Sequence, residues 1–114
     1  MGLYALNQQL QENTRIMERC NEKDEKFVKE RAALYQQEKK LLHLKALLNS
    51  PTVSEQEKEQ IREDVEKLDN NLATMEEHLI KARLSNDTIR KQAEDEREEI
   101  IKAIEAIEID EQSM

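Results

Sequence analysis

The residues whose side chains most often carry chemistry are few in this sequence: two histidines, His43 and His78, and one cysteine, Cys20. Metal sites on helices place His and Glu three or four residues apart, so that the ligands share one face. Lys40 precedes His43 by three residues and Met75 precedes His78 by three, so neither histidine fits this pattern. We therefore expect no metal site and no cofactor.

Acidic residues are plentiful, with 26 Asp and Glu among 114 residues. At this density, pairs such as Asp24-Glu25 and Glu76-Glu77 arise by chance. Two carboxylates act as acid and base only in a concave site that gives them different pKa values. The paired helices predicted below provide no such cleft, and we therefore expect a non-catalytic protein with no catalytic residues rather than an enzyme.

Cys20 is the only cysteine, so the chain cannot form an internal disulfide. Disulfides are rare in reducing compartments, and their absence favours a cytoplasmic, intracellular location over secretion. A reactive thiol needs an exposed, positively charged setting, whereas acidic residues offset the basic ones near Cys20 and an apolar row contains it. We therefore predict that Cys20 is a small, buried core residue.

The composition is compatible with two classes of protein. Charged residues make up 39% of the chain and hydrophobic residues 37%, with one Gly, one Pro and no Trp, which is typical either of disorder or of long helices and coiled coils. Residues 1–52 carry nine basic and seven acidic side chains, and residues 53–114 carry nine and nineteen. The acidic half argues against nucleic acid or an anionic membrane as a partner. No apolar run approaches the roughly 20 residues that a membrane span needs.

The strongest break in the chain is the segment 49–52, Asn-Ser-Pro-Thr. Pro51 cannot continue a helix because it lacks an N–H, and Asn49 can end one in the left-handed conformation. Two overlapping capping boxes begin at Thr52 and Ser54, which indicates that a new helix starts here. We predict a helix over residues 3–49, a turn over 50–53 and a helix over 54–110.

Apolar residues recur with a heptad spacing in both predicted helices, which argues against disorder. In the second helix, steps of four and three from Ile61 keep one register to Ile107, with only Asn86 and Glu96 breaking the pattern. The principal row of the first helix is Leu6, Asn13, Cys20, Phe27, Leu34, Leu41 and Leu48.

A short connection places neighbouring helices antiparallel. With a turn near residue 51, the numbers of facing residues should sum to about 102. Leu41 would then face Ile61, and Cys20 would face Ala82. Asn13 and Asn86 fall one layer apart in this register. This spacing allows two arrangements: their amides meet between the helices, or each amide points to water.

The predicted fold class is all-α: a long antiparallel helical hairpin, coiled-coil-like, in a single domain over residues 1–114. An alternative break lies at residues 85–88, Ser-Asn-Asp-Thr, because these side chains compete with helical hydrogen bonds. A turn there would give a three-helix bundle. Additional apolar residues outside the hairpin seam favour a further possibility, a dimeric four-helix bundle.

The predicted partner-binding surface has two parts. The end of the second helix, residues 94–111, combines isoleucines with nine acidic residues and extends past the predicted reach of the first helix. An additional apolar row on the first helix has no partner in the hairpin. The candidate residues are Ile100, Ile101, Ile104, Ile107, Ile109, Val28, Tyr35 and Leu42.

The size, acidity and helix–turn–helix layout of the whole chain resemble tubulin-binding cofactor A, a small three-helix chaperone, and single subunits of coiled-coil complexes. The resemblance is one of layout, so no site residue is transferred from it. It implies, as an alternative, a three-helix chaperone or adaptor that binds a folded client. Our main expectation is a cytoplasmic coiled-coil scaffold subunit that binds partner helices, as a homodimer or within a larger complex.

Overall fold

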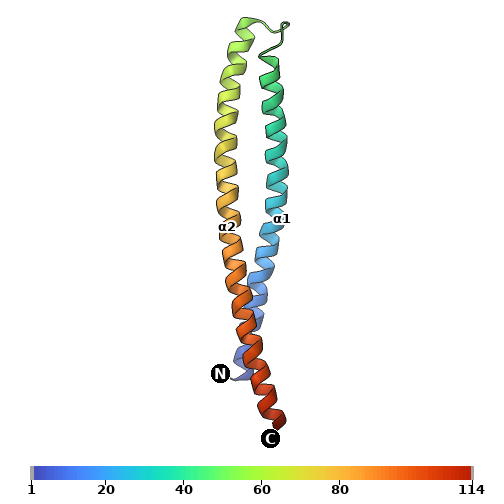
Figure 1. The fold of residues 1–114 in the computed structure, drawn as a ribbon, viewed down its shortest axis with the longest axis vertical. Coiled ribbons are helices and arrows are strands. Elements are labelled where there is room, and N and C mark those ends of the chain that lie inside the picture. Colours follow the sequence, from blue (N-terminus) through green and yellow to red (C-terminus); the bar gives the residue numbers. More distant parts are fainter. Residues whose placement is uncertain (1, 114) are drawn as a thin grey trace. The chain divides into compact units, whose positions relative to one another are not determined.

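The computed structural model describes residues 2–113 and contains two α-helices, α1 (Leu3–Leu47) and α2 (Glu55–Ser113). The helices pack antiparallel (Figure 1), which confirms the predicted all-α fold class and the helical hairpin. The observed helix ends differ from the predicted ranges, 3–49 and 54–110, by a few residues at most.

The turn between the helices follows the predicted capping chemistry at one of its two ends. The Ser54 hydroxyl accepts a hydrogen bond from the Glu57 N–H at 3.2 Å and so caps α2. At the other end, the N–H groups of Asn49 and Ser50 each donate to the carbonyl three residues earlier, at 3.1 Å. No non-glycine residue of the described chain has a positive φ. The predicted left-handed conformation of Asn49 is therefore wrong, because 3₁₀-type bonds end α1 instead.

The second helix runs without interruption through residues 85–88, so the predicted alternative of a three-helix bundle is wrong. The polar side chains in this segment do not compete successfully with the helix because they form other bonds. The Thr88 hydroxyl donates to the Leu84 carbonyl of its own helix at 3.0 Å, and the Asn86 amide donates to a carbonyl of α1 at 3.1 Å. Neither side chain therefore replaces a backbone hydrogen bond of α2.

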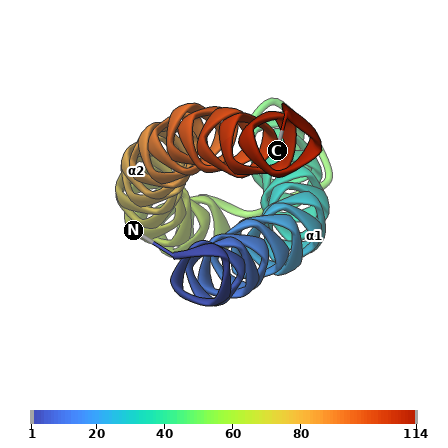
Figure 2. The same ribbon diagram turned by 90° about the horizontal axis from the view of Figure 1, so that it is seen from below.

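The packing divides the chain into two compact units. Unit 1 contains the residues up to Glu25 and those from Arg83 onward, and unit 2 is Lys26–Ala82, which includes the turn. Within each unit, a stretch of α1 lies beside a stretch of α2 and has no second helical neighbour (Figures 1 and 2). Each helix stretch therefore has one covered face.

The core of unit 2 comes from the principal apolar row of α1 and from one row of α2. Its most buried members are Leu34, Leu41, Leu72 and Leu79, and Phe27, Val65 and Leu68 pack against them. Ile61, which was predicted to face Leu41, is only half-buried, and Met75, two heptads further along α2, is exposed. The heptad pattern of α2 was therefore correct. The residues of α2 that pack most deeply, however, are Leu72 and Leu79, not the row of Ile61 and Met75.

The core of unit 1 corrects the predicted register directly. Cys20 is buried, as predicted, but it lies against Asn86 rather than at the level of Ala82, and Asn13 lies against Ala93. Facing residue numbers therefore sum to 106 in this unit. The shift of four residues is about one helical turn.

Candidate interaction surface

Two polar layers lie inside unit 1. In the first, the Asn13 amide donates from Nδ2 to the Ala93 carbonyl at 2.6 Å. Its Oδ1 accepts a hydrogen bond from Arg97, at 3.5 Å. Arg97 also donates to the Thr14 hydroxyl at 3.0 Å. This layer links α2 to α1 through side chains that are buried or half-buried, so it holds the two helices at a fixed level.

The second layer lies one heptad earlier along α2, and here the asparagine comes from α2 instead of α1. Asn86 donates from Nδ2 to the Cys20 carbonyl at 3.1 Å and to Asp24 Oδ1 at 3.0 Å. Arg90 donates to the Asp24 carboxylate and, at 3.2 Å, to Asn21 Oδ1. The hydrogen bond and the negative charge of Asp24 raise the pKa of Arg90 above its usual value.

Both layers connect α1 to α2 within unit 1. Neither predicted arrangement of the Asn13 and Asn86 amides is observed, because each amide bonds to a backbone carbonyl of the opposite helix instead. The sequence therefore identified the two seam asparagines correctly but misplaced them relative to each other. The sequence analysis did not predict that Arg90 and Arg97 would bond to α1. Their spacing of seven residues, which places them on one face of α2, was the signal that could have indicated it.

Unit 2 exposes an apolar row on α1, which we call the outer row: Val28, Tyr35 and Leu42. Their exposed fractions are 70%, 56% and 66%, and their spacing of seven places them on one face of the helix. The Lys39 ammonium lies 4.7 Å from the centre of the Tyr35 ring, in a cation–π contact. The structure thus brings three of the candidate residues together on a single exposed face.

The isoleucines at the end of α2 are divided between core and surface. Ile100 is only 4% exposed and belongs to the core of unit 1, so its side chain is not on the surface. Ile104 and Ile107 are half-buried, whereas Ile101 and Ile109 are exposed. The acidic end therefore presents a partly covered apolar stripe.

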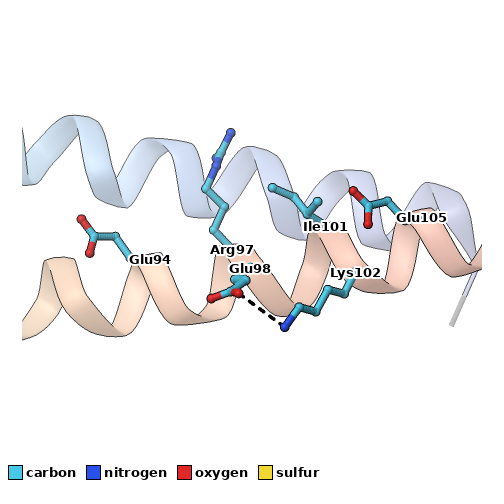
Figure 3. A pocket seen from close by; sticks show the side chains of 6 residues that line it. All are labelled: Glu94, Arg97, Glu98, Ile101, Lys102 and Glu105. Atoms are coloured by element: carbon cyan, nitrogen blue, oxygen red, sulfur yellow. Dashed lines mark ion pairs between the residues drawn. The ribbon is translucent and has the colours of Figure 1, made fainter.

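Ile101 lies in a shallow hollow whose other lining side chains are all charged: Glu94, Arg97, Glu98, Lys102 and Glu105 (Figure 3). Arg97 extends toward α1, where it bonds to Thr14. Glu98 pairs with Lys102 at 3.4 Å on the side away from α1. The Glu105 carboxylate lies beside Ile101, and Glu94 lies about two helical turns earlier, at the other end of the hollow (Figure 3). Neither carboxylate has an ion pair among the described residues.

Unit 2 has a second hollow that the sequence did not predict. It lies between the helices and is lined by Glu30, Leu34, Met75, His78, Leu79 and Ala82. Ala82, which was predicted to face Cys20, and Met75, from the same apolar pattern of α2, are both exposed in the observed register.

The chemistry that the described residues offer is limited. Residues 2–113 contain no group of three or more His, Cys, Asp or Glu that could hold a metal ion. In the same part of the chain, no helix is long and apolar enough to span a membrane. Each unit also exposes large apolar side chains, among them Leu42 in unit 2 and Leu84 in unit 1.

No protein-family model matches this chain, and comparisons with curated proteins and with solved structures also give no match.

Proposed function

We propose that this chain is a non-catalytic interaction subunit of the coiled-coil type. It binds helices of protein partners through the outer row of unit 2 and through the acidic, isoleucine-rich end of α2. It works as a homodimer or as one subunit of a larger assembly. The lone, buried Cys20 is compatible with the cytoplasm, which is where we place the protein.

The observation that carries this proposal is the outer row. The part of α1 in unit 2 has two apolar rows, and α2 covers only the one that contains Leu34 and Leu41. A large apolar side chain gains roughly 1.5–3 kcal/mol on full burial, so three of them in line favour association with another helix. Single exposed apolar residues are ordinary on a protein surface, but a heptad row is the pattern of a helix–helix contact.

The end of α2 supports the same function less directly. Ile101 and its neighbouring carboxylates combine an apolar anchor with negative charge. Such a surface suits a partner that carries basic side chains around an apolar position. It gives unit 1 a proposed contact surface of its own.

The proposal is tested by changing the outer row without touching the core. In the variant Val28→Ser/Tyr35→Ser/Leu42→Ser, we expect the helical content to be retained and association to be lost. Sedimentation velocity over a range of concentrations measures self-association of the purified chain. Cross-linking at Lys29 and Lys39 in cells, followed by mass spectrometry, identifies contacts with other proteins.

The matched control is Leu84→Ser, because Leu84 is also an exposed leucine, at 62%, but lies in unit 1. We expect this variant to associate like the unmodified chain. A chain that is monomeric at all concentrations and forms no cross-links at the outer row in cells would contradict the proposal.

A further inference from the structure

The outer row is one half of a complete coiled-coil seam. Positions four residues after each of its members are Ala32, Lys39 and Ala46, all exposed. Rows separated by alternating steps of four and three form the a and d positions of a heptad. We call the six residues together the outer seam.

The composition of the outer seam favours close approach by another helix. Its two alanines leave room for the side chains of a partner between the larger Val28, Tyr35 and Leu42. Residues 28 and 46 are separated by about 27 Å along the helix axis. A partner helix of about three heptads would cover this length.

The charge around the outer seam is positive. The part of α1 in unit 2, Lys26–Leu47, carries six basic and two acidic side chains, whereas the part of α2, Glu55–Ala82, carries four and nine. Two of these basic residues form ion pairs with α2: Arg31 pairs with Glu76 at 3.6 Å and Lys45 pairs with Asp69 at 3.8 Å. Lys29, which flanks the seam, and Lys39, which belongs to it, have no ion pair among the described residues, so both remain available to a partner.

This charge argues against two copies of the outer seam packing on each other. A parallel pair would place Lys39 against its own copy. An antiparallel pair centred on Tyr35 would place Lys39 opposite Arg31. Both orientations bring like charges together, which disfavours pairing.

We propose that the outer seam binds an amphipathic helix whose positions flanking its own apolar row are acidic. This inference rests on the proposed function and specifies the chemistry of the partner. The apolar row of the partner covers Val28, Tyr35 and Leu42, and its carboxylates pair with Lys29 and Lys39. Opposite charges at flanking positions select the partner and its orientation in coiled coils.

The test uses the full chain and two synthetic peptides of about 21 residues, which is three heptads. Both peptides carry Leu at the a positions and Ala at the d positions. The acidic peptide has Glu at the flanking e and g positions, and the basic peptide has Lys there. Fluorescence anisotropy of labelled peptide measures binding, at low salt and again at 1 M NaCl.

We expect the acidic peptide to bind about tenfold more tightly than the basic one at low salt, with the difference reduced at high salt. The variant Lys29→Glu/Lys39→Glu should reverse the preference. The control Lys40→Glu/Lys67→Glu changes the net charge equally but alters no flank of the seam, and should keep the original preference. The variant Val28→Ser/Leu42→Ser should bind neither peptide.

Equal binding of the two peptides, or tighter binding of the basic one, would overturn the inference. So would an equal effect of the two charge variants, because binding would then follow the net charge and not the seam. If neither peptide binds while the outer-row variant still abolishes association of the chain, the acidic partner is wrong and the proposed function stands. If the outer-row variant also has no effect, both are wrong.

Discussion

Asn86 and Cys20 bond to each other's backbone across unit 1. The Asn86 amide donates from Nδ2 to the Cys20 carbonyl at 3.1 Å, and the Cys20 thiol lies 4.0 Å from the Asn86 carbonyl. Because both partners are buried, this contact fits only one alignment of α1 with α2 in this unit. It comes with a cost, since Asn86 Oδ1 is buried and has no hydrogen-bond partner among the described residues.

This unsatisfied oxygen predicts that Asn86→Leu raises stability. A buried acceptor without a partner costs about 1–3 kcal/mol, and the substitution removes it and adds apolar surface to the seam. We expect the free energy of unfolding to rise by about 1 kcal/mol after the loss of the two amide hydrogen bonds. Urea denaturation followed by circular dichroism measures the change.

Asn13→Leu is the matched comparison, because Asn13 is equally buried but both ends of its amide have partners. We expect this variant to gain less stability than Asn86→Leu, or to lose some. If the two variants gave the same change, the unsatisfied oxygen would not be the cause.

The ion pair between Arg90 and Asp24 predicts a salt-dependent loss of stability in Asp24→Asn. Asn keeps the size of the side chain but removes the charge that Arg90 contacts. We expect the midpoint of urea unfolding to fall at low salt, and the difference from the unmodified chain to shrink at 1 M NaCl, where the Debye length is about 3 Å. Glu12→Gln, which removes an exposed pair with Arg15, should change the free energy of unfolding by less than about 0.5 kcal/mol. A loss in Asp24→Asn that salt does not reduce would indicate a lost hydrogen bond rather than a lost charge pair.

The pH dependence of this pair follows from the direction of the pKa shift. Since folding raises the pKa of Arg90, its contribution is complete below the pKa in the unfolded chain and is lost as pH rises through the folded value. Arginine titrates above about pH 12, so we expect no change in this contribution between neutral pH and about pH 11. Urea midpoints of the unmodified chain and Asp24→Asn should keep a constant difference over that range. A difference that falls by about pH 9 would show that another group titrates with the pair.

Two adjacent leucines test which face of α1 is covered. Leu41 is 8% exposed and packs in the core of unit 2, whereas Leu42 is 66% exposed. We expect Leu41→Ala to lower the free energy of unfolding by about 2–5 kcal/mol, and Leu42→Ala to change it by less than about 0.5 kcal/mol. Thermal or urea unfolding measures both. Comparable losses at the two positions in the monomeric chain would mean that the chain itself covers the outer row, which would also contradict the proposed function.

The sequence predicted the helices and the turn because their signals are local. Pro51 and the Ser54 cap affect only the residues next to them in the chain. The heptad spacing of α1 can be read from the sequence of α1 alone. The register could not be predicted with the same accuracy, because it depends on how the turn residues connect the helices and on which of two apolar rows of α2 packs more deeply. A shift of one helical turn keeps apolar residues opposite apolar residues along most of the seam, so the pattern alone does not distinguish the two registers.

The same limit applies to the candidate site. Val28, Tyr35 and Leu42 were found because an extra apolar row is visible in the sequence, and the structure leaves all three exposed. Ile100 was included because the predicted register placed it at the end of α1. In the structure Ile100 is buried in unit 1, together with Leu6. Their numbers sum to 106, as in the other facing pairs of unit 1. The start of α1 therefore covers α2 as far as about residue 100.

A disulfide provides the most direct test of the register in unit 1. Asn86→Cys places a second thiol opposite Cys20, where hydrogen bonds already show a close approach of the two helices. A disulfide needs Cα atoms within about 7 Å, so its formation reports directly whether residues 20 and 86 face each other. We expect mild oxidation to join the two thiols within one chain, as seen by altered mobility on a non-reducing gel and by a cross-linked peptide pair in mass spectrometry. Leu84→Cys, whose position is exposed, should leave Cys20 reduced. A reversed outcome for the two variants would mean that Asn86 does not face Cys20 in solution, and the register with sums of 106 would be wrong.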